Sequence, residues 1–168
     1  MGRLADQWAQ RRITMRIPFV FAGELIQAAS ITGVQFPDAT FMNNIDKPYE
    51  IHRMKPWVSP LDTNGVLLAN ATTFDEDTLQ NIVRLTIADL GKNEKLTKSA
   101  TLIVMLVKGS SERTWEFADP YYLVRSELIQ VIVDTLAFPT AISGLTNLRI
   151  QVSFQGFLVV VAPPSESR

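Results

Sequence analysis

His52 is the only histidine in this chain of 168 residues, and the chain contains no cysteine. A Ser-His-Asp triad would have to be built on His52, because the triad needs an imidazole as its general base. The residues around it, 50–54 (EIHRM), show no strained turn of the kind that exposes a nucleophile. The lack of cysteine excludes thiol catalysis, disulfides and cysteine-based zinc sites. We interpret His52 as an ordinary strand residue and predict no enzyme, no catalytic residue and no cofactor.

Two charged clusters are candidates for ion or partner binding. The carboxylates of Asp75-Glu76-Asp77 are of the type that calcium prefers, but their spacing matches no calcium-loop motif. We favour a capped turn, in which Asp75 accepts hydrogen bonds from free backbone N–H groups, and predict no metal site. Lys92, Lys95 and Lys98 recur every three residues in a polar stretch. This pattern is typical of a solvated connection, and a basic docking patch is the alternative.

Four aromatic residues lie close together in the sequence: Trp115, Phe117, Tyr121 and Tyr122. On the surface of a β-sandwich, Trp115, Tyr121 and Tyr122 would form a candidate ligand platform on which a sugar ring could stack. The alternative is core packing with a contact at the rim, which is the more frequent fate of such residues.

The first 16 residues differ in composition from the rest of the chain. They contain four arginines and one acid, together with a tryptophan that offers a large apolar anchor for an interface. We predict an N-terminal arm, 1–16, that binds a partner, and a frayed terminus is the alternative. The predicted partner-binding residues are Arg3, Trp8, Arg11, Arg12 and Arg16.

From residue 17 onward, β-branched and aromatic residues dominate, and proline and glycine interrupt them at short intervals. This pattern predicts an all-β domain over 17–161, an antiparallel β-sandwich, and about eight strands fit a jelly roll best. Residues 162–168 are expected to form a C-terminal tail. The expected strands are 17–21, 28–36, 49–58, 81–87, 100–107, 113–117, 121–125, 128–133 and 150–160.

The expected strand 150–160 has the clearest alternation of apolar and polar residues in the sequence. Phe154 shares its parity with Ile150, Val152, Leu158 and Val160, and we therefore place Phe154 in the core. Gly156 interrupts the pattern and predicts a bulge or bend in the strand.

Composition and charge exclude several further classes of protein. The net charge of −1 gives no electrostatic basis for binding nucleic acid or an anionic membrane. The longest apolar runs are too short to span a bilayer, and the first 16 residues lack the apolar core of a secretory signal. We therefore expect no nucleic-acid partner and no membrane partner.

Three segments resemble virion proteins of tailed bacteriophages: residues 45–54 (IDKPYEIHRM), 93–98 (NEKLTK) and 152–158 (VSFQGFL). The chain is most similar to the small decoration, or cement, proteins of the jelly-roll type, and the likeness extends over most of residues 18–161. None of the three segments is a catalytic signature.

This resemblance implies a virion structural protein that binds the outer surface of the major capsid shell. It implies a partner, the major capsid protein, and a homo-oligomer, either a dimer or a trimer, that cross-links neighbouring capsomers. It also implies synthesis in the host cytoplasm and a final location on the capsid exterior. Two alternatives remain open at this point: a single-jelly-roll protein that forms the shell itself, and a carbohydrate-binding β-sandwich module.

Overall fold

Most of the chain that the structure describes is β-strand. The computed structural model describes residues 13–31, 33–45, 48–68, 79, 81–97, 99–107, 114–123, 127–138 and 142–161. One sheet has the strand order β1-β9-β3-β7 and the other the order β2-β8-β4-β5, with β6 also paired to β4. The elements are β1 (Ile13–Ala28), β2 (Ala39–Ile45), β3 (Tyr49–Leu61), β4 (Val83–Asp89), β5 (Glu94–Lys95), β6 (Thr101–Leu102), α3 (Ile103–Leu106), β7 (Trp115–Leu123), β8 (Glu127–Thr135) and β9 (Asn147–Val161).

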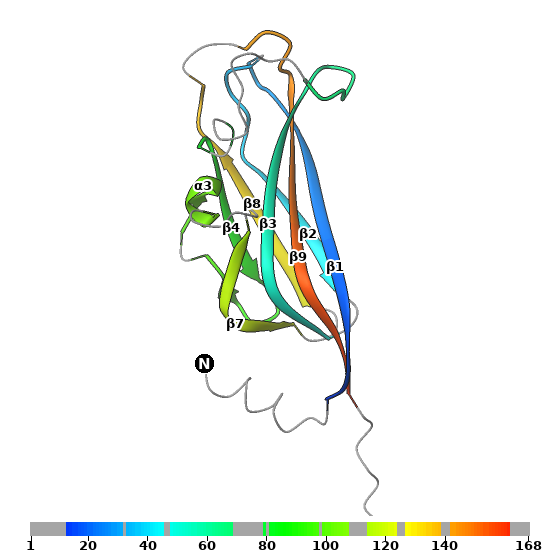
Figure 1. Ribbon diagram of the computed structural model, residues 1–168. Coiled ribbons are helices and arrows are strands. Elements are labelled where there is room, and N and C mark those ends of the chain that lie inside the picture. The colour runs from blue at the N-terminus through cyan, green and yellow to red at the C-terminus, as the bar shows by residue number, and fades with distance from the viewer. Residues whose placement is uncertain are drawn as a thin grey trace, which may run out of the picture.

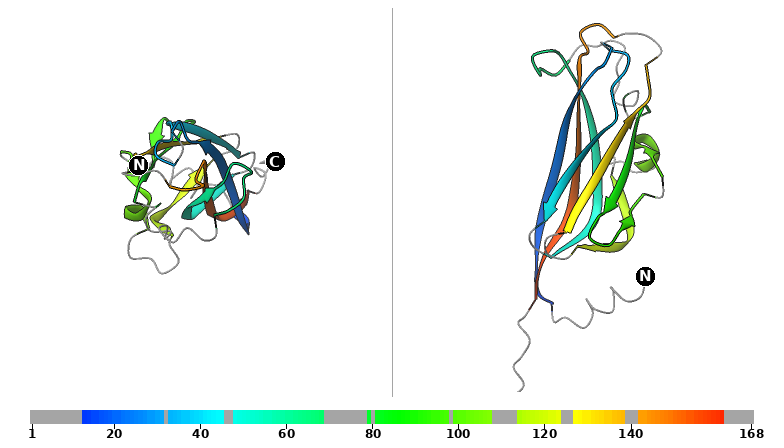
Figure 2. Two further views of the ribbon diagram at one scale, coloured as in Figure 1. Left: turned by 90° about the horizontal axis from the view of Figure 1, so that it is seen from above. Right: turned by 180° about the vertical axis from the view of Figure 1, so that it is seen from behind.

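This strand order is that of a jelly roll, and the predicted fold class is confirmed. The first strand pairs with the last, and the second pairs with the last but one, all antiparallel. The two sheets lie face to face, and the long strands run side by side along an elongated sandwich (Figures 1 and 2). The short strands β5 and β6 pair with opposite ends of β4, so together they take the place of one edge strand.

The core lies between the two sheets, where alternate residues of each strand face inward. In β4 these are Val83, Leu85 and Ile87, which alternate with polar residues in the sequence, and in β9 they include Phe154, which is fully buried. The ring of Phe154 stacks on that of Phe21 from β1, with centroids 4.7 Å apart. Alternation therefore locates the inward face of these strands correctly.

Strand β3 contains a β-bulge at His52, directly opposite Gly156 of β9. The register places Ile51 against Gly156 and Arg53 against Gln155, so His52 is the extra residue. A Cβ atom on Gly156 would lie 1.8 Å from the carbonyl oxygen of Glu50. The glycine is thus explained by close approach, and the bulge lies in its partner strand rather than in β9, where the sequence predicted it.

Past Gly156 the predicted alternation fails. Val159 is buried, with 4% of its surface exposed, whereas Val160 is 39% exposed. The backbone N–H of Val159 donates to the carbonyl oxygen of Pro48 at 3.0 Å, just beyond the start of β3. Val160 shares the parity of Phe154 but does not lie in the core, because β9 here runs past the start of β3 and has β1 as its one strand neighbour among the described residues.

β1 begins at Ile13, four residues before the predicted start of the domain at residue 17. Ile13 pairs with Val161 and Arg16 with Val159, so the sandwich starts earlier than the change in composition indicates. The strand also continues through Ala22-Gly23, because β9 offers an unbroken partner as far as Asn147. The rest of the predicted arm, 1–12, and the predicted tail, 162–168, lie outside the described residues.

Four other elements differ from the prediction. The expected strand 28–36 is the end of β1 and a turn closed by a bridge between Ile31 and Gln35. Residues 100–107 form β6 and the four-residue helix α3, since a short apolar run fits a strand and a buried helix equally well. Residues 115–123 form one strand through Asp119-Pro120, which β7 tolerates because it is an edge strand. Strand β2 was not predicted.

The prolines of β3 are explained by its neighbours. β7 pairs with β3 only from Tyr49 to Met54, so from Lys55 onward the side of β3 away from β9 has no strand partner in the described part of the chain. Pro56 and Pro60 fall in this part, where a missing backbone donor is tolerated. Pro56, inside the expected strand 49–58, thus lies in a half of β3 that is an edge among the described strands.

Candidate functional site

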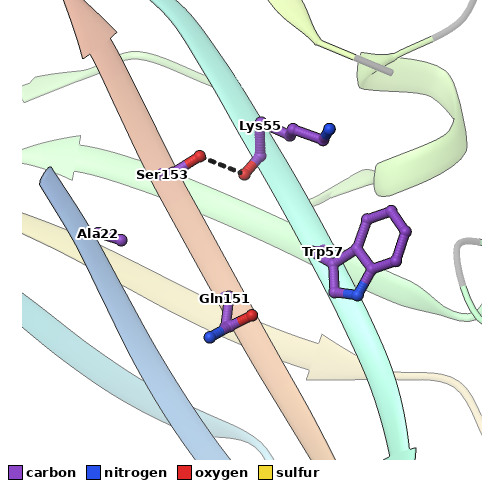
Figure 3. A pocket seen from close by; sticks show the side chains of 5 residues that line it. All are labelled: Ala22, Lys55, Trp57, Gln151 and Ser153. Atoms are coloured by element: carbon purple, nitrogen blue, oxygen red, sulfur yellow. Dashed lines mark hydrogen bonds between the residues drawn. The ribbon is translucent and has the colours of Figure 1, made fainter. Parts of the chain in front are cut away.

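The outer face of the sheet β1-β9-β3-β7 carries a shallow hollow. Its lining comes from three neighbouring strands, and its volume is about 390 Å³. The register places Ser153 of β9 between Ala22 and Lys55, and Gln151 of β9 beside Trp57. We call this feature the Trp57 hollow. Its lining residues are Ala22, Lys55, Trp57, Gln151 and Ser153 (Figure 3).

The hollow exists because small side chains lie between larger ones. Ala22 and Ser153 face each other across β1 and β9 and leave the middle of the face open (Figure 3). Lys55 and Trp57 project from the half of β3 that β7 does not reach. Met54, Pro56 and Val58 alternate with them and are buried. The inward residues of β3 therefore anchor the strand while its outward residues line the hollow.

Hydrogen bonds hold several lining groups in place. The indole Nε1 of Trp57 donates to Ser59 Oγ at 3.0 Å, and the ammonium Nζ of Lys55 lies 5.8 Å from the centroid of the Trp57 ring. Gln151 Nε2 donates to Glu24 Oε2 at 2.9 Å, and Ser153 Oγ donates to the carbonyl oxygen of Lys55 at 3.3 Å. The hollow thus combines an aromatic ring with amide, hydroxyl and ammonium groups, which is a lining suited to binding a polar ligand that has an apolar face.

The predicted platform of Trp115, Tyr121 and Tyr122 is not formed. Trp115 and Tyr121 pack against the core on either side of Phe117, with ring centroids 4.7 Å and 6.4 Å from that of Phe117. Tyr122 pairs with Glu50 in the register and lies on the opposite face. Successive residues of a strand point to opposite faces, and Tyr121 and Tyr122 therefore cannot share one platform.

Tyr121 belongs to a buried polar cluster around Asp89. The Asp89 carboxylate is fully buried, and it accepts hydrogen bonds from Gly91 N and Tyr121 Oη at 2.9 Å and from Lys92 Nζ at 3.0 Å. Lys92 also donates to the carbonyl oxygen of Tyr122. The cluster therefore ties the turn after β4 to β7 of the other sheet.

The Asp89 cluster bears on whether Lys92, Lys95 and Lys98 form a solvated connection or a basic docking patch. The side chain of Lys92 is only 11% exposed and is committed to Asp89, whereas Lys95 is exposed on β5. Lys98 lies outside the described residues, as does Asp75-Glu76-Asp77. Lys92 is therefore a structural residue, and the described lysines do not form a basic patch.

Arg16 and His52 meet at a second buried carboxylate, that of Glu50. Arg16 Nε donates to Glu50 Oε2 at 2.9 Å, and His52 Nε2 lies 2.9 Å from Glu50 Oε1. The hydrogen bond to Glu50 raises the pKa of Arg16, and burial raises the pKa of the neighbouring Tyr122. Arg16 therefore fastens the start of β1 to β3 and belongs to the sandwich, while its role in binding a partner stays a prediction.

The surroundings of His52 are the carboxylate of Glu50, within hydrogen-bond distance, and an aromatic ring. Its ring meets that of Phe157 edge-on, with centroids 5.3 Å apart. No hydroxyl nucleophile is hydrogen-bonded to it among the described residues. The same part of the chain contains no group of three or more His, Cys, Asp or Glu side chains arranged to hold a metal ion.

Exposed apolar side chains lie near the start of β1, at the end of the sandwich where β1 and β9 extend beyond β3 (bottom of Figure 1). Met15 pairs with Val160, and the two side chains are 52% and 39% exposed. The chain enters the described fold at Ile13 and leaves it at Val161, both at this end. We call this surface the apolar end. Its residues are Met15, Ile17, Phe19 and Val160, which share one face of the paired strands β1 and β9, whereas Val20 is exposed on the other face.

The remaining predicted partner-binding residues, Arg3, Trp8, Arg11 and Arg12, lie outside the described residues. Among the described residues, no helix has the length and apolar character that a membrane crossing requires. Comparison of the chain with protein-family models, with curated proteins and with solved structures finds no match.

Sequence reasoning missed both the Trp57 hollow and the apolar end. A signal for the first was available, because Lys55, Trp57 and Ser59 occupy the polar parity of an alternating strand, and a tryptophan at such a position is expected to face outward. The apolar end has no comparable signal, since its residues look like an ordinary strand until the partners of β1 are known.

Proposed function

We propose that the chain is a decoration protein of a tailed bacteriophage, which binds the outer surface of the major capsid shell and stabilises the head by cross-linking capsomers. The observation that carries this proposal is the apolar end. Clustered apolar side chains on the surface of a soluble β-sandwich mark a protein contact, because burying them against a partner is favourable.

The position of the apolar end also supports the proposal. β1 begins there, so residues 1–12, with Trp8 and three arginines, are attached to the same end of the sandwich. An attached arm and an apolar surface at one end can contact the same capsid neighbour or a sister subunit. In a shell, such contacts are repeated many times, so modest individual affinities add through multivalency.

The jelly roll and the small net charge fit this role without proving it. Jelly rolls occur in capsid proteins, in lectins and in cupins, so the fold alone does not assign a function. The net charge of −1 suits a protein that faces solvent and other proteins rather than the packaged genome. A homo-oligomer, dimer or trimer, would place several apolar ends on one capsid surface.

Sedimentation with phage heads that lack this protein tests the proposal. The full chain should bind to the heads, and Met15→Glu should weaken binding at least tenfold, because burial of one large apolar side chain is worth about 1.5–3 kcal/mol. Val66→Glu is the matched control, since Val66 is similarly exposed but lies in the turn after β3, at the other end of the sandwich.

Two results would refute the proposal. The first is a full chain that does not sediment with the heads at any concentration. The second is equal binding by Met15→Glu and Val66→Glu. Electron microscopy of the purified chain separates the remaining alternative, because a shell-forming protein would assemble into closed particles without a major capsid protein.

A further inference from the structure

The Trp57 hollow has hydrogen-bonding groups that the fold does not use. Among the described residues, Lys55 Nζ has no carboxylate or carbonyl partner, and its only recorded neighbour is the Trp57 ring at 5.8 Å. Gln151 donates through Nε2 to Glu24, while its amide oxygen accepts no recorded hydrogen bond. Ser153 donates to a backbone carbonyl and keeps its acceptor capacity. Donors and acceptors therefore remain available around an aromatic ring.

A second cation lies beside the hollow. Arg149 precedes Gln151 by two residues in β9 and so shares its outer face, where it pairs with Ser59 of β3. Its Nε atom is buried and has no hydrogen-bond partner. Arg149 forms no ion pair in the described part of the chain, and the carboxylate of Glu24 on the same face accepts a hydrogen bond from Gln151, which leaves its negative charge in place. The face thus presents two cations that form no ion pair with the described residues, beside the single carboxylate of Glu24.

The volume and openness of the hollow limit the ligand. At about 390 Å³ it falls within the range of small-molecule sites, and it lies on an open sheet face rather than in a closed cavity. A ligand there must have an apolar face for Trp57, hydroxyl groups for Gln151 and Ser153, and negative charge for Lys55 and Arg149. A sugar that carries a carboxylate meets all of these requirements.

We propose that the outer face of the sheet β1-β9-β3-β7 binds an acidic saccharide at the Trp57 hollow. The C–H face of one sugar ring stacks on Trp57, and its carboxylate lies between Lys55 and Arg149. The hydroxyl groups of the ring bond to Gln151 and Ser153. This inference does not depend on capsid binding, because the hollow and the apolar end use different residues.

Titration of the full chain with defined sugars tests this inference. Sialyllactose and trigalacturonic acid serve as acidic probes, and lactose and maltotriose as their neutral counterparts, with affinity measured by calorimetry and by NMR shifts of the Trp57 indole N–H. At least one acidic probe should bind ten or more times tighter than its neutral counterpart, and the difference should shrink as salt is added.

Variants distinguish this site from non-specific attraction. Trp57→Ala should reduce the affinity for the acidic probe at least tenfold, and Lys55→Gln and Arg149→Gln should each reduce it about fivefold. Lys95→Gln is the matched control, because Lys95 is exposed on β5 of the other sheet and should leave affinity unchanged. If Trp57→Ala does not fold, Trp57→Phe keeps a smaller ring and should lose affinity only in part.

Three outcomes would overturn the inference. Neither acidic probe binds more tightly than its neutral counterpart, or the folded Trp57 variants bind as well as the unchanged chain, or Lys95→Gln weakens binding as much as Lys55→Gln does.

Discussion

At Gly156, strand β9 passes so close to β3 that no larger residue fits. A Cβ atom built on Gly156 lies 1.8 Å from the carbonyl oxygen of Glu50, whereas ordinary contacts of this kind begin at 3.4 Å. In Gly156→Ala the two strands must separate locally by roughly 1.5 Å. That movement strains the bulge at His52 and loosens the ladder around Ile51, where each lost hydrogen bond costs about 1 kcal/mol. When the cost of overpacking is added, we expect Gly156→Ala to lower the free energy of unfolding by about 3–5 kcal/mol.

Denaturant unfolding of the isolated chain measures this loss, and thermal unfolding should show a fall in Tm of roughly 6–20 °C. Gly65→Ala is the control, because Gly65 has a φ of +76° but nothing within 4 Å of a built Cβ. Its expected cost is about 1–2 kcal/mol, from backbone strain alone. Gly156 has no positive φ, so its cost must come from the contact with Glu50. A loss below about 1 kcal/mol for Gly156→Ala would refute the close approach of the two strands.

Three further predictions concern buried groups. Phe154→Ala should cost about 3–5 kcal/mol of stability, as truncation of a fully buried aromatic residue does, and an almost unchanged Tm would show that this part of β9 is peripheral. Asp89→Asn leaves the ammonium of Lys92 without its carboxylate and should cost about 3–5 kcal/mol in denaturant unfolding, whereas Asp134→Asn, in a more exposed pair, should cost about 1 kcal/mol or less. Burial raises the pKa of Tyr49, so its hydroxyl ionises at a lower pH in the unfolded state than in the folded state. The contribution of Tyr49 to the free energy of unfolding is therefore constant below about pH 10 and falls as the pH rises further. Tyr49→Phe should remove this part of the alkaline loss, up to about 1.4 kcal/mol per pH unit, and an unchanged alkaline slope in the variant would contradict it.

The parts of the fold that the sequence predicts correctly are those in which local pattern and tertiary burial agree. Val83, Leu85 and Ile87 alternate with polar residues and face the core, and Phe154 does the same in β9. The all-β class and the jelly-roll arrangement follow from many such strands separated by short turns. Where burial depends on a distant partner, the pattern is insufficient. Val160 continues the alternation of β9, yet it is exposed because β9 extends beyond β3.

The candidate sites were harder to predict, because they depend on which residues lie opposite each other. Arg16 belongs to a basic segment of sequence, but its guanidinium pairs with Glu50, 34 residues away. Trp115 and Tyr121 cluster in sequence with Tyr122 but turn inward, whereas Trp57 lines a hollow with Gln151 and Ser153 from β9. Composition indicates which side chains are available, and only the register of β1, β9 and β3 shows which of them share a surface.

The pairing of β1 with β9 has a consequence for how the protein is made. β1 pairs with β9 along its whole length and with no other strand in the described residues, and β9 is the last strand of the domain. A ribosome adds about 5–20 residues per second, so β1 must wait several seconds, while on the order of a hundred residues are synthesised, before its partner exists. During that time its backbone N–H and C=O groups and its apolar side chains are open to unwanted pairing with other nascent chains. Chaperone capture of the nascent chain, or slow translation only after the codons for β9, would therefore raise the yield of folded protein.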